Sequence, residues 1–249
     1  MKFFFETQHN SLVIGAKGAI GSACVKAMKN AGADVTEIDL NYPSQASKQN
    51  KFLKCDVCNI EEVIKSAKKI KSIHSVIHAV GLNHDSNVID TDWKEYRKVM
   101  SANLDSAFHV AKVYGKRMAN QSFGSFVFLS SFAGLRGEAG ASIYCASKFG
   151  LIGLVESFAA EMTPHNVRVN CISPGNVDSP MLKDVANKIA ARMKTSPQTV
   201  LEEMAKSGSA QRLVKPEEVA NLAVFLASDM ASGITGSNVR IDCGAWIDS

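Results

Sequence analysis

Short apolar runs rich in β-branched residues alternate along the chain with longer stretches whose apolar positions recur at helical spacing. The apolar runs predict strands at Ser11–Ile14, Asp34–Asp39, Phe52–Cys55, Ser75–Ala79, Ser125–Ser130, Val167–Ile172 and Val239–Asp242. The periodic stretches predict helices near residues 20–31, 60–70, 93–120, 146–162 and 216–227. This alternation is typical of an α/β fold in which helices cover both faces of a parallel sheet.

The stretch from Pro180 to Arg212 interrupts the alternation, because no strand is predicted in it. The pair Ser196-Pro197 is typical of a helix start. Apolar residues recur there at helical spacing, namely Met181, Leu182, Val185, Ile189 and Met193. An insertion after a strand end is well placed to cover a pocket. We therefore predict a helical lid at about residues 180–212; the alternative is a plain helical elaboration.

The bulk composition is that of one globular domain, which we predict over residues 1–249. Of the 249 residues, 46% are hydrophobic and 21% are charged, enough to bury a core. The net charge of +4 is small, and the densest basic group, Lys65–Lys71, is typical of a solvated helix face. These features argue against nucleic-acid binding. No uninterrupted apolar run reaches the ~18 residues of a membrane span, which predicts no membrane partner.

The six cysteines are scattered and lack the density of a secreted disulfide scaffold. Reduced thiols in the cytoplasm are the simpler interpretation. Cys55 and Cys58 form a CxxC pair, but a zinc site would need two further ligands at compatible spacing. The sequence therefore predicts a cytoplasmic protein without a bound metal.

A glycine-rich segment follows the first predicted strand and opens the first helix. It contains Gly15, Lys17, Gly18, Ala19, Ile20 and Gly21. Glycines allow a tight turn and let backbone N–H groups approach a pyrophosphate at a helix N-terminus. The position of this segment between strand and helix therefore predicts a dinucleotide-binding loop.

Acidic residues end the second and third predicted strands. A carboxylate at Asp39 can accept hydrogen bonds from ribose hydroxyls and would repel a 2′-phosphate, which predicts NAD in preference to NADP. Lys17 is a competing signal, because a cation in the glycine loop can hold that phosphate. Asp56 and Val57 are placed to contact the adenine; alternatively, Asp56 caps the next helix.

Tyr144 and Lys148 lie four residues apart at the head of a predicted helix and therefore on one face of it. A phenol with a pKa of ~10 is a poor base at neutral pH. An ammonium at ~4 Å stabilises the phenolate by up to ~4 kcal/mol at an effective dielectric of ~20. We therefore predict that Lys148 lowers the pKa of Tyr144 and makes it a proton donor and acceptor.

Three further segments are placed near this pair. Ser131 follows a strand and can hold a substrate oxygen together with Tyr144. Asn103 lies inside an apolar helix, where an amide organises a water against Lys148 or makes an ordinary helix–helix hydrogen bond. The loop after the sixth predicted strand is expected to meet a nicotinamide through Pro174, Gly175, Val177 and Ser179.

In this order, the motifs resemble the short, single-domain branch of the short-chain dehydrogenase/reductase family. The resemblance runs from about residue 11 to 244 and includes the ending Ile234-Thr235-Gly236 … Ile241-Asp242-Cys243-Gly244. It implies a Rossmann-type fold with a doubly wound, seven-stranded parallel sheet, and a homotetramer or homodimer. It also implies that Tyr144 is the acid/base, that Lys148 contacts the nicotinamide ribose, that Ser131 fixes the reacting oxygen and that Asn103 supports a proton relay.

Two motifs depart from the family pattern. The usual TGxxxGxG lacks its threonine and its second glycine here, and Gly15, Gly18 and Gly21 also fit a GxxGxxG pattern. The usual NNAG is replaced by His78-Ala79-Val80-Gly81. We place Ala79 and Gly81 among the cofactor contacts and interpret His78 as a core histidine.

These observations predict an NAD(H)-dependent oxidoreductase that interconverts a secondary alcohol and a ketone, with a lean towards oxidation. The alternatives are a 3-oxoacyl-thioester reductase that uses NADPH, a non-catalytic nicotinamide-binding protein and, from GxxGxxG, a sugar-nucleotide enzyme. The substrate pocket is expected near His84, residues 132–138, Asn176 and the lid. The expected partner is a small alcohol or carbonyl compound.

Overall fold

The structure is a computed structural model that describes residue 5, residues 8–43 and residues 51–247. Its centre is one seven-stranded parallel sheet with the order β3-β2-β1-β4-β5-β6-β7. The strands are β1 (Asn10–Ile14), β2 (Asp34–Asp39), β3 (Phe52–Lys54), β4 (Ser75–His78), β5 (Gly124–Leu129), β6 (Val167–Pro174) and β7 (Asn238–Ile241). The predicted strands and the doubly wound Rossmann-type sheet are confirmed, with ends that shift by one or two residues.

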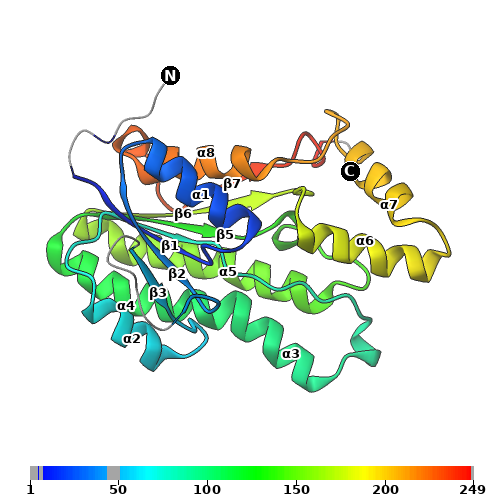
Figure 1. Cartoon of the computed structure of the whole chain (residues 1–249), viewed down its shortest axis with the longest axis horizontal. Coiled ribbons are helices and arrows are strands. Elements are labelled where there is room, and N and C mark those ends of the chain that lie inside the picture. Colours follow the sequence, from blue (N-terminus) through cyan, green and yellow to red (C-terminus); the bar gives the residue numbers. More distant parts are fainter. Residues whose placement is uncertain (1–4, 6–7, 44–50, 248–249) are drawn as a thin grey trace.

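Helices cover both faces of this sheet (Figure 1). Helices α1 (Ala19–Asn30) and α8 (Pro216–Ala227) lie on one face. The opposite face is covered by α2 (Ile60–Lys68), α4 (Ser106–Gln121) and α5 (Ser142–Met162). Helix α3 (Trp93–Met100) precedes α4, while α6 (Pro180–Met193) and α7 (Pro197–Lys206) lie beside the sheet (Figure 1).

The alternation of side chains along each strand divides the core into two layers. On β5, Phe126 and Phe128 point into the layer under α4 and α5, whereas Val127 and Leu129 belong to the layer under α1 and α8. Because both faces are covered, these strands are apolar along most of their length, which is why the sequence predicts them well. All four of these side chains are almost fully buried.

The predicted helix over residues 93–120 is not continuous. Residues Ser101–Asp105 form a π-helical segment between α3 and α4, so that Asn103 lies at a wider turn than an α-helix would give. Helix α5 begins at Ser142, earlier than expected, which places Tyr144 in its first turn. These two departures shape the site described below, in agreement with the tendency of π-bulges to occur at functional sites.

The stretch predicted as a lid contains two helices, α6 and α7. They pack against each other around a small apolar cluster of Ala186, Ala190 and Val200, separate from the two core layers. Ser179 and Ser196 cap the two helices, and a proline follows each serine. The segment therefore holds together as a helical pair beside the main body.

Residues Ser142–His165 are long and apolar enough to cross a membrane by length and composition alone. In this fold the same helix packs in the core, where Leu151, Val155 and Phe158 are buried together with residues of β5 and β6. Its apolar composition is therefore accounted for by its place against the sheet.

Candidate active site

Two cavities lie at the carboxyl ends of the strands, near the point between β1 and β4 where the order of the strands in the sheet reverses. The Gly15 cavity, of about 310 Å³, extends from the glycine loop to Asp39, Val57 and Gly81. The Tyr144 cavity, of about 220 Å³, lies between Tyr144, Ser131 and helix α6. In open α/β sheets a crevice at this reversal is the general place for a ligand.

The glycine loop is shaped by contacts that a side chain would obstruct. Gly15 has φ +80°, and a Cβ there would stand 2.9 Å from the Ala79 backbone. A Cβ on Gly21 would stand 1.9 Å from the Gly15 carbonyl oxygen. Gly18 is the N-cap of α1 and makes no side-chain cap, so no cap side chain pairs with the first N–H groups of α1. Such unpaired N–H groups at a helix start suit a pyrophosphate.

Asp39 is buried at the end of β2 and accepts two backbone hydrogen bonds. Its Oδ2 accepts from the Lys17 amide at 3.0 Å and its Oδ1 from the Asn41 amide at 2.9 Å. The Lys17 ammonium donates to the Asn41 carbonyl at 3.2 Å and lies 5.5 Å from the Tyr42 ring centroid. The carboxylate and not the ammonium therefore lines the Gly15 cavity.

Asp56 and Val57 also line the Gly15 cavity. Asp56 Oδ1 accepts from the Cys58 amide at 2.9 Å, whereas Asn59 caps α2 by accepting from the Glu61 amide at 3.0 Å. The alternative interpretation of Asp56 as the helix cap is therefore wrong, because the cap lies three residues further on.

The six cysteines are free thiols, and the Cys55 and Cys58 side chains line the same cavity. Burial raises the pKa of Cys55 to about 11 and also raises that of Cys58. Within the described residues, no group of three or more His, Cys, Asp or Glu side chains is arranged to hold a metal ion.

Asn103 lies in the π-helical segment and connects it to the loop after β4 and to helix α5. Its Oδ1 accepts from the Leu82 amide at 2.7 Å, and its Nδ2 donates to the Leu82 carbonyl at 2.9 Å and to Ser147 Oγ at 2.8 Å. Of the two interpretations of Asn103 drawn from the sequence, the bond to Ser147 agrees with the helix–helix hydrogen bond. Ser147 in turn donates to the Tyr144 carbonyl at 2.7 Å, which ties Asn103 to the first turn of α5.

Lys148 is buried between the two cavities. Its Nζ donates to the Leu129 carbonyl at 2.8 Å and lies 5.7 Å from the Tyr144 ring centroid. Burial lowers the pKa of Lys148 to about 8, against the raising effect of the nearby Cys171 thiol. A Cβ on Gly81 would stand 3.3 Å from this Nζ and 3.5 Å from Asn103 Oδ1. Glycine at position 81 thus leaves room for both groups.

Tyr144 and Ser131 face the Tyr144 cavity together. Burial raises the pKa of Tyr144, and a hydrogen bond with Ser131 acts in the opposite direction. The predicted lowering of this pKa by Lys148 is therefore wrong for the structure as it stands. The physical reason is that burial desolvates the phenol, and this effect exceeds the lowering effect of the Ser131 hydrogen bond.

The end of β6 and the loop that follows it line the Tyr144 cavity. Pro174, Gly175, Val177 and Ser179 all line the Tyr144 cavity, as does Ile20 of the glycine loop. Ser179 Oγ accepts from the Leu182 amide at 3.2 Å, so this hydroxyl is used as the cap of α6. Val177 pairs with Val214 in a parallel bridge that closes the base of the α6–α7 segment.

His78 is fully buried, in agreement with its interpretation as a core histidine. Its Nε2 lies 3.0 Å from Ser106 Oγ, while its Nδ1 has no hydrogen-bond partner among the described residues. Burial, followed by the charge of Lys148, lowers the pKa of His78 to about 3. The ring is therefore neutral and is not placed to exchange a proton with a substrate.

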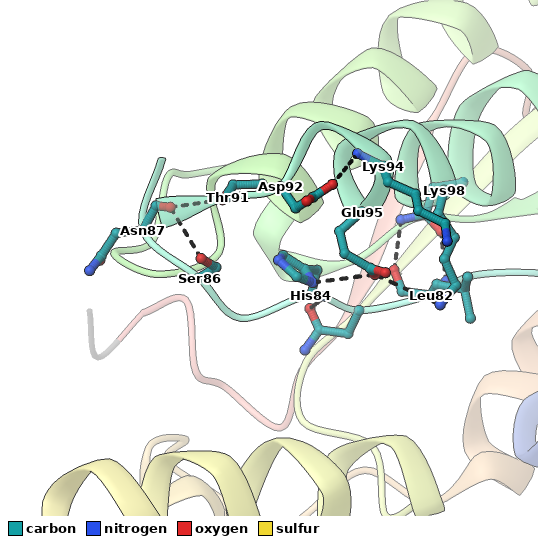
Figure 2. A network of polar contacts seen from close by, with 11 residues as sticks. Leu82, His84, Ser86, Asn87, Thr91, Asp92, Lys94, Glu95 and Lys98 are labelled. Carbon is teal, nitrogen blue, oxygen red and sulfur yellow. Dashed lines mark hydrogen bonds and ion pairs between the residues drawn. The ribbon is translucent and has the colours of Figure 1, made fainter. Parts of the chain in front are cut away.

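Sequence reasoning missed one ion pair of the Tyr144 cavity. Arg192 of α6 donates to Asp85 at 3.2 Å, and both residues line the cavity with His84. Figure 2 shows His84 and Ser86, the two neighbours of Asp85 in sequence, with His84 directed towards Glu95. His84 Nδ1 lies 3.9 Å from Glu95 Oε2. By contrast, Arg136, expected in the pocket, stacks on Phe132 at 4.8 Å from its ring centroid and is exposed.

Together, the fold and the geometry define a class. A glycine loop at the start of α1 and a buried carboxylate at the end of β2 line one cavity, and the tyrosine of a Tyr-Lys pair on α5 lines the other. This is the arrangement of a Rossmann-type oxidoreductase that binds a nicotinamide cofactor.

Comparison with known proteins makes this assignment specific. A family model described as "Enoyl-(Acyl carrier protein) reductase" matches residues 15–245. The chain is 32% identical to dehydrogenase/reductase SDR family member 6 of Aquarana catesbeiana, over 94% of this chain and 95% of that protein. It is 29% identical to the 3-oxoacyl-acyl-carrier-protein reductase FabG of Rickettsia felis, over 96% and 97% of the two chains.

Among solved structures, the ligand-free aldohexose dehydrogenase of Thermoplasma acidophilum superposes with a TM-score of 0.87 at 27% identity, covering 96% of this chain and 94% of the other. The chain therefore belongs to the short-chain dehydrogenase/reductase family. It is similar to members that bear the names of different activities, so family membership leaves its substrate open.

Proposed function

We propose that this protein is an NAD(H)-dependent oxidoreductase that interconverts a secondary alcohol and a ketone, with Tyr144 as the acid/base. The observation that supports this most strongly is the convergence of Tyr144, Ser131 and Lys148 at the carboxyl end of β5. Tyr144 and Ser131 face one cavity, and Lys148 lies against Gly81, which lines the other.

The bound cofactor supplies the hydride chemistry, which takes place at the carbinol carbon. During oxidation Tyr144 Oη accepts the hydroxyl proton of the alcohol, and during reduction it returns that proton to the carbonyl oxygen. Ser131 holds the same oxygen by a hydrogen bond. Lys148 supplies a positive charge next to the phenol, and Asn103 fixes the first turn of α5 through Ser147.

The choice of NAD rests on Asp39. Its carboxylate lines the Gly15 cavity and is buried, so a 2′-phosphate beside it would bring two negative charges together at low dielectric. The Lys17 ammonium, which could oppose this effect, is engaged by the Asn41 carbonyl.

The experiment is a screen of the purified protein with NADH or NADPH against a panel of ketones, and with NAD or NADP against the matching secondary alcohols. We expect turnover of at least one pair, faster with NAD(H). A protein that binds NADH in a titration yet consumes none of it across the panel would overturn the catalytic proposal and favour the non-catalytic alternative.

A second candidate is the reduction of a 3-oxoacyl thioester with NADPH, which the likeness to FabG supports. The two candidates separate on one assay, the NADPH-dependent reduction of a 3-oxobutanoyl thioester of N-acetylcysteamine. If this thioester is reduced faster than every simple ketone, and with NADPH in preference to NADH, the second candidate replaces the first.

We also propose a homo-oligomer, a homotetramer or a homodimer, in the cytoplasm. Large aromatic side chains stand exposed on three neighbouring helices, with Trp93 66%, Phe108 51% and Phe149 45% accessible. The free thiols accord with a reducing compartment. Sedimentation equilibrium tests the assembly, and a monomer at micromolar concentration would contradict it.

A further inference from the structure

The Asp85–Arg192 pair closes the far side of the Tyr144 cavity. Arg192 Nη1 donates to both carboxylate oxygens of Asp85, at 3.2 and 3.4 Å, across 107 positions of sequence. The Asp85 side chain is 15% exposed and that of Arg192 57%. The pair therefore joins the loop after β4 to the last turn of α6, with the cavity between them.

The α6–α7 segment is also attached to the main body at its base. There, the Asp178 amide donates to the Val214 carbonyl at 2.9 Å, and the Val214 amide donates to the Asn176 carbonyl at 2.8 Å. Since α6 and α7 share their own small apolar cluster, the segment can move as one body about that base. The ion pair is at the opposite end of α6, where it opposes such a motion most effectively.

Asp85 itself is held firmly. The neighbouring Ser86 amide donates to the Gly140 carbonyl at 2.7 Å. Gly140 has φ +81°, and a Cβ there would stand 2.7 Å from Asp85 Oδ1 and 3.4 Å from Arg192 Nη1. On the other side, Thr91 and Ser86 both donate to the Asn87 carbonyl, as Figure 2 shows. The loop thus presents the carboxylate from a fixed position.

The charges that line the cavity do not favour an anion. Among the described residues around it, Arg192 is the single lysine or arginine, and Asp85 neutralises it. Glu138 adds another carboxylate. The rest of the α6 wall is apolar, formed by Met181, Leu182, Val185 and Ile189. A substrate carboxylate would therefore lose water without gaining an unpaired cation.

We propose that Asp85 is a specificity-determining residue: it neutralises Arg192 and holds α6 closed, so that the site selects uncharged alcohols and ketones over their carboxylate analogues. This inference rests on the proposed function and names the substrate class of that site. Its consequence is that removal of the Asp85 charge frees Arg192 to accept an anion.

The experiment compares 4-oxopentanoate with its methyl ester as substrates in the presence of NADH. The wild-type protein should favour the ester by roughly tenfold or more in kcat/KM, because the carboxylate of the acid meets no unpaired cation in the cavity and faces Asp85 and Glu138. In Asp85→Asn this preference should fall by about tenfold, chiefly through a lower KM for the acid. An Asp85→Asn/Arg192→Gln double variant should lose the improved kcat/KM for the acid, because Asp85 acts through Arg192.

Glu202→Gln is the matched control. It makes the same change of carboxylate to amide on α7, the helix packed against α6. There, Glu202 is exposed and accepts a hydrogen bond from Gln198 at 2.9 Å. Its ester-to-acid ratio should equal that of the wild type. An unchanged ratio in Asp85→Asn, or the same change in the control, would overturn the proposal.

Two readouts separate this inference from the proposed function. Hydrogen exchange of residues 180–193 should accelerate in Asp85→Asn and in Arg192→Gln, with no further acceleration in the double variant. Calorimetric binding of the ester and the acid to the NADH complex should show the same charge preference without turnover. Preference in binding with no turnover would refute only the proposed reaction, whereas equal binding of ester and acid in all variants would refute the role of Asp85.

Discussion

The Lys148 ammonium lies close against Gly81: a Cβ at position 81 would stand 3.3 Å from the ammonium nitrogen. Such a distance is tighter than ordinary van der Waals contact, and the same Cβ would stand 3.5 Å from Asn103 Oδ1. The glycine that remains from the usual motif after β4 therefore serves to seat the lysine beside the phenol.

Gly81→Ala should displace the Lys148 ammonium by a few tenths of an ångström and lower kcat by roughly threefold to tenfold, since the chemical step depends on the exact placement of the groups around it. The measurement is steady-state turnover with a saturating alcohol, alongside NADH affinity. Gly153→Ala is the control, because a Cβ there meets nothing within 4 Å. Equal kcat values for the two variants would contradict the role of Gly81.

The rate of alcohol oxidation should rise with pH. Burial raises the pKa of Tyr144, so its deprotonated form, which accepts the alcohol proton, is a minor species at neutral pH. The initial rate of oxidation should therefore increase by ~tenfold per pH unit across neutrality, whereas ketone reduction, which uses the protonated phenol, should change little. A plateau of oxidation below pH 7 would show that the phenol ionises more readily than its burial allows.

Asp39→Asn should weaken the preference for NAD over NADP. Loss of charge-assisted hydrogen bonds to the ribose costs ~1.5–3 kcal/mol, or roughly tenfold to a hundredfold in the ratio of kcat/KM values. Asp34→Asn provides the control, because Asp34 lies at the start of the same strand and pairs with Lys51 away from the two cavities. An undiminished preference would shift the origin of cofactor choice to another residue.

The protein should lose stability in acid through histidines whose pKa is lowered in the folded state. The pKa values of His78 and His9 are lowered by burial from 6.5 to about 3 and about 4. Above pH 6.5 these histidines are neutral in both the folded and the unfolded chain, and their contribution to stability is fully present. Between pH 6.5 and the lowered pKa of each histidine, only the unfolded chain binds the proton. The free energy of unfolding should therefore fall by ~1.4 kcal/mol per pH unit for each histidine between about pH 6 and pH 4.

Urea unfolding at several pH values measures this slope. His9→Gln should reduce it, because one of the titrating histidines is then absent in both states. A slope that is the same in this variant and in the wild type would mean that His9 is as easily protonated in the folded protein as in the unfolded chain.

The fold was predictable because its strands are buried on both faces and therefore form continuous apolar runs, as Phe126 to Leu129 do. The glycine loop, Asp39 and the Tyr144–Lys148 spacing are local patterns, and the structure brings them to two cavities at the carboxyl ends of the strands. The π-helical turn at Asn103 could not be foreseen, because it accompanies hydrogen bonds to Leu82 and Ser147 that are formed only in the tertiary structure.

The contacts that sequence reasoning missed are likewise tertiary. Asp85 and Arg192 are far apart in sequence, and neither lies in a local pattern that indicates a partner. The pKa of Tyr144 was predicted with the wrong sign because helical spacing shows that a lysine is near but not that burial desolvates the phenol, which is the largest effect on its pKa. Distance alone therefore does not fix the electrostatics of such a pair.

The central claim is that the Tyr144 hydroxyl carries the proton, and single-turnover kinetics of Tyr144→Phe test it most directly. With enzyme in excess over a ketone that the wild type reduces, NADH absorbance should decay at least a thousandfold more slowly in the variant. NADH binding, measured by fluorescence titration, should stay within about twofold. Hydride transfer at the wild-type rate in Tyr144→Phe would contradict the account.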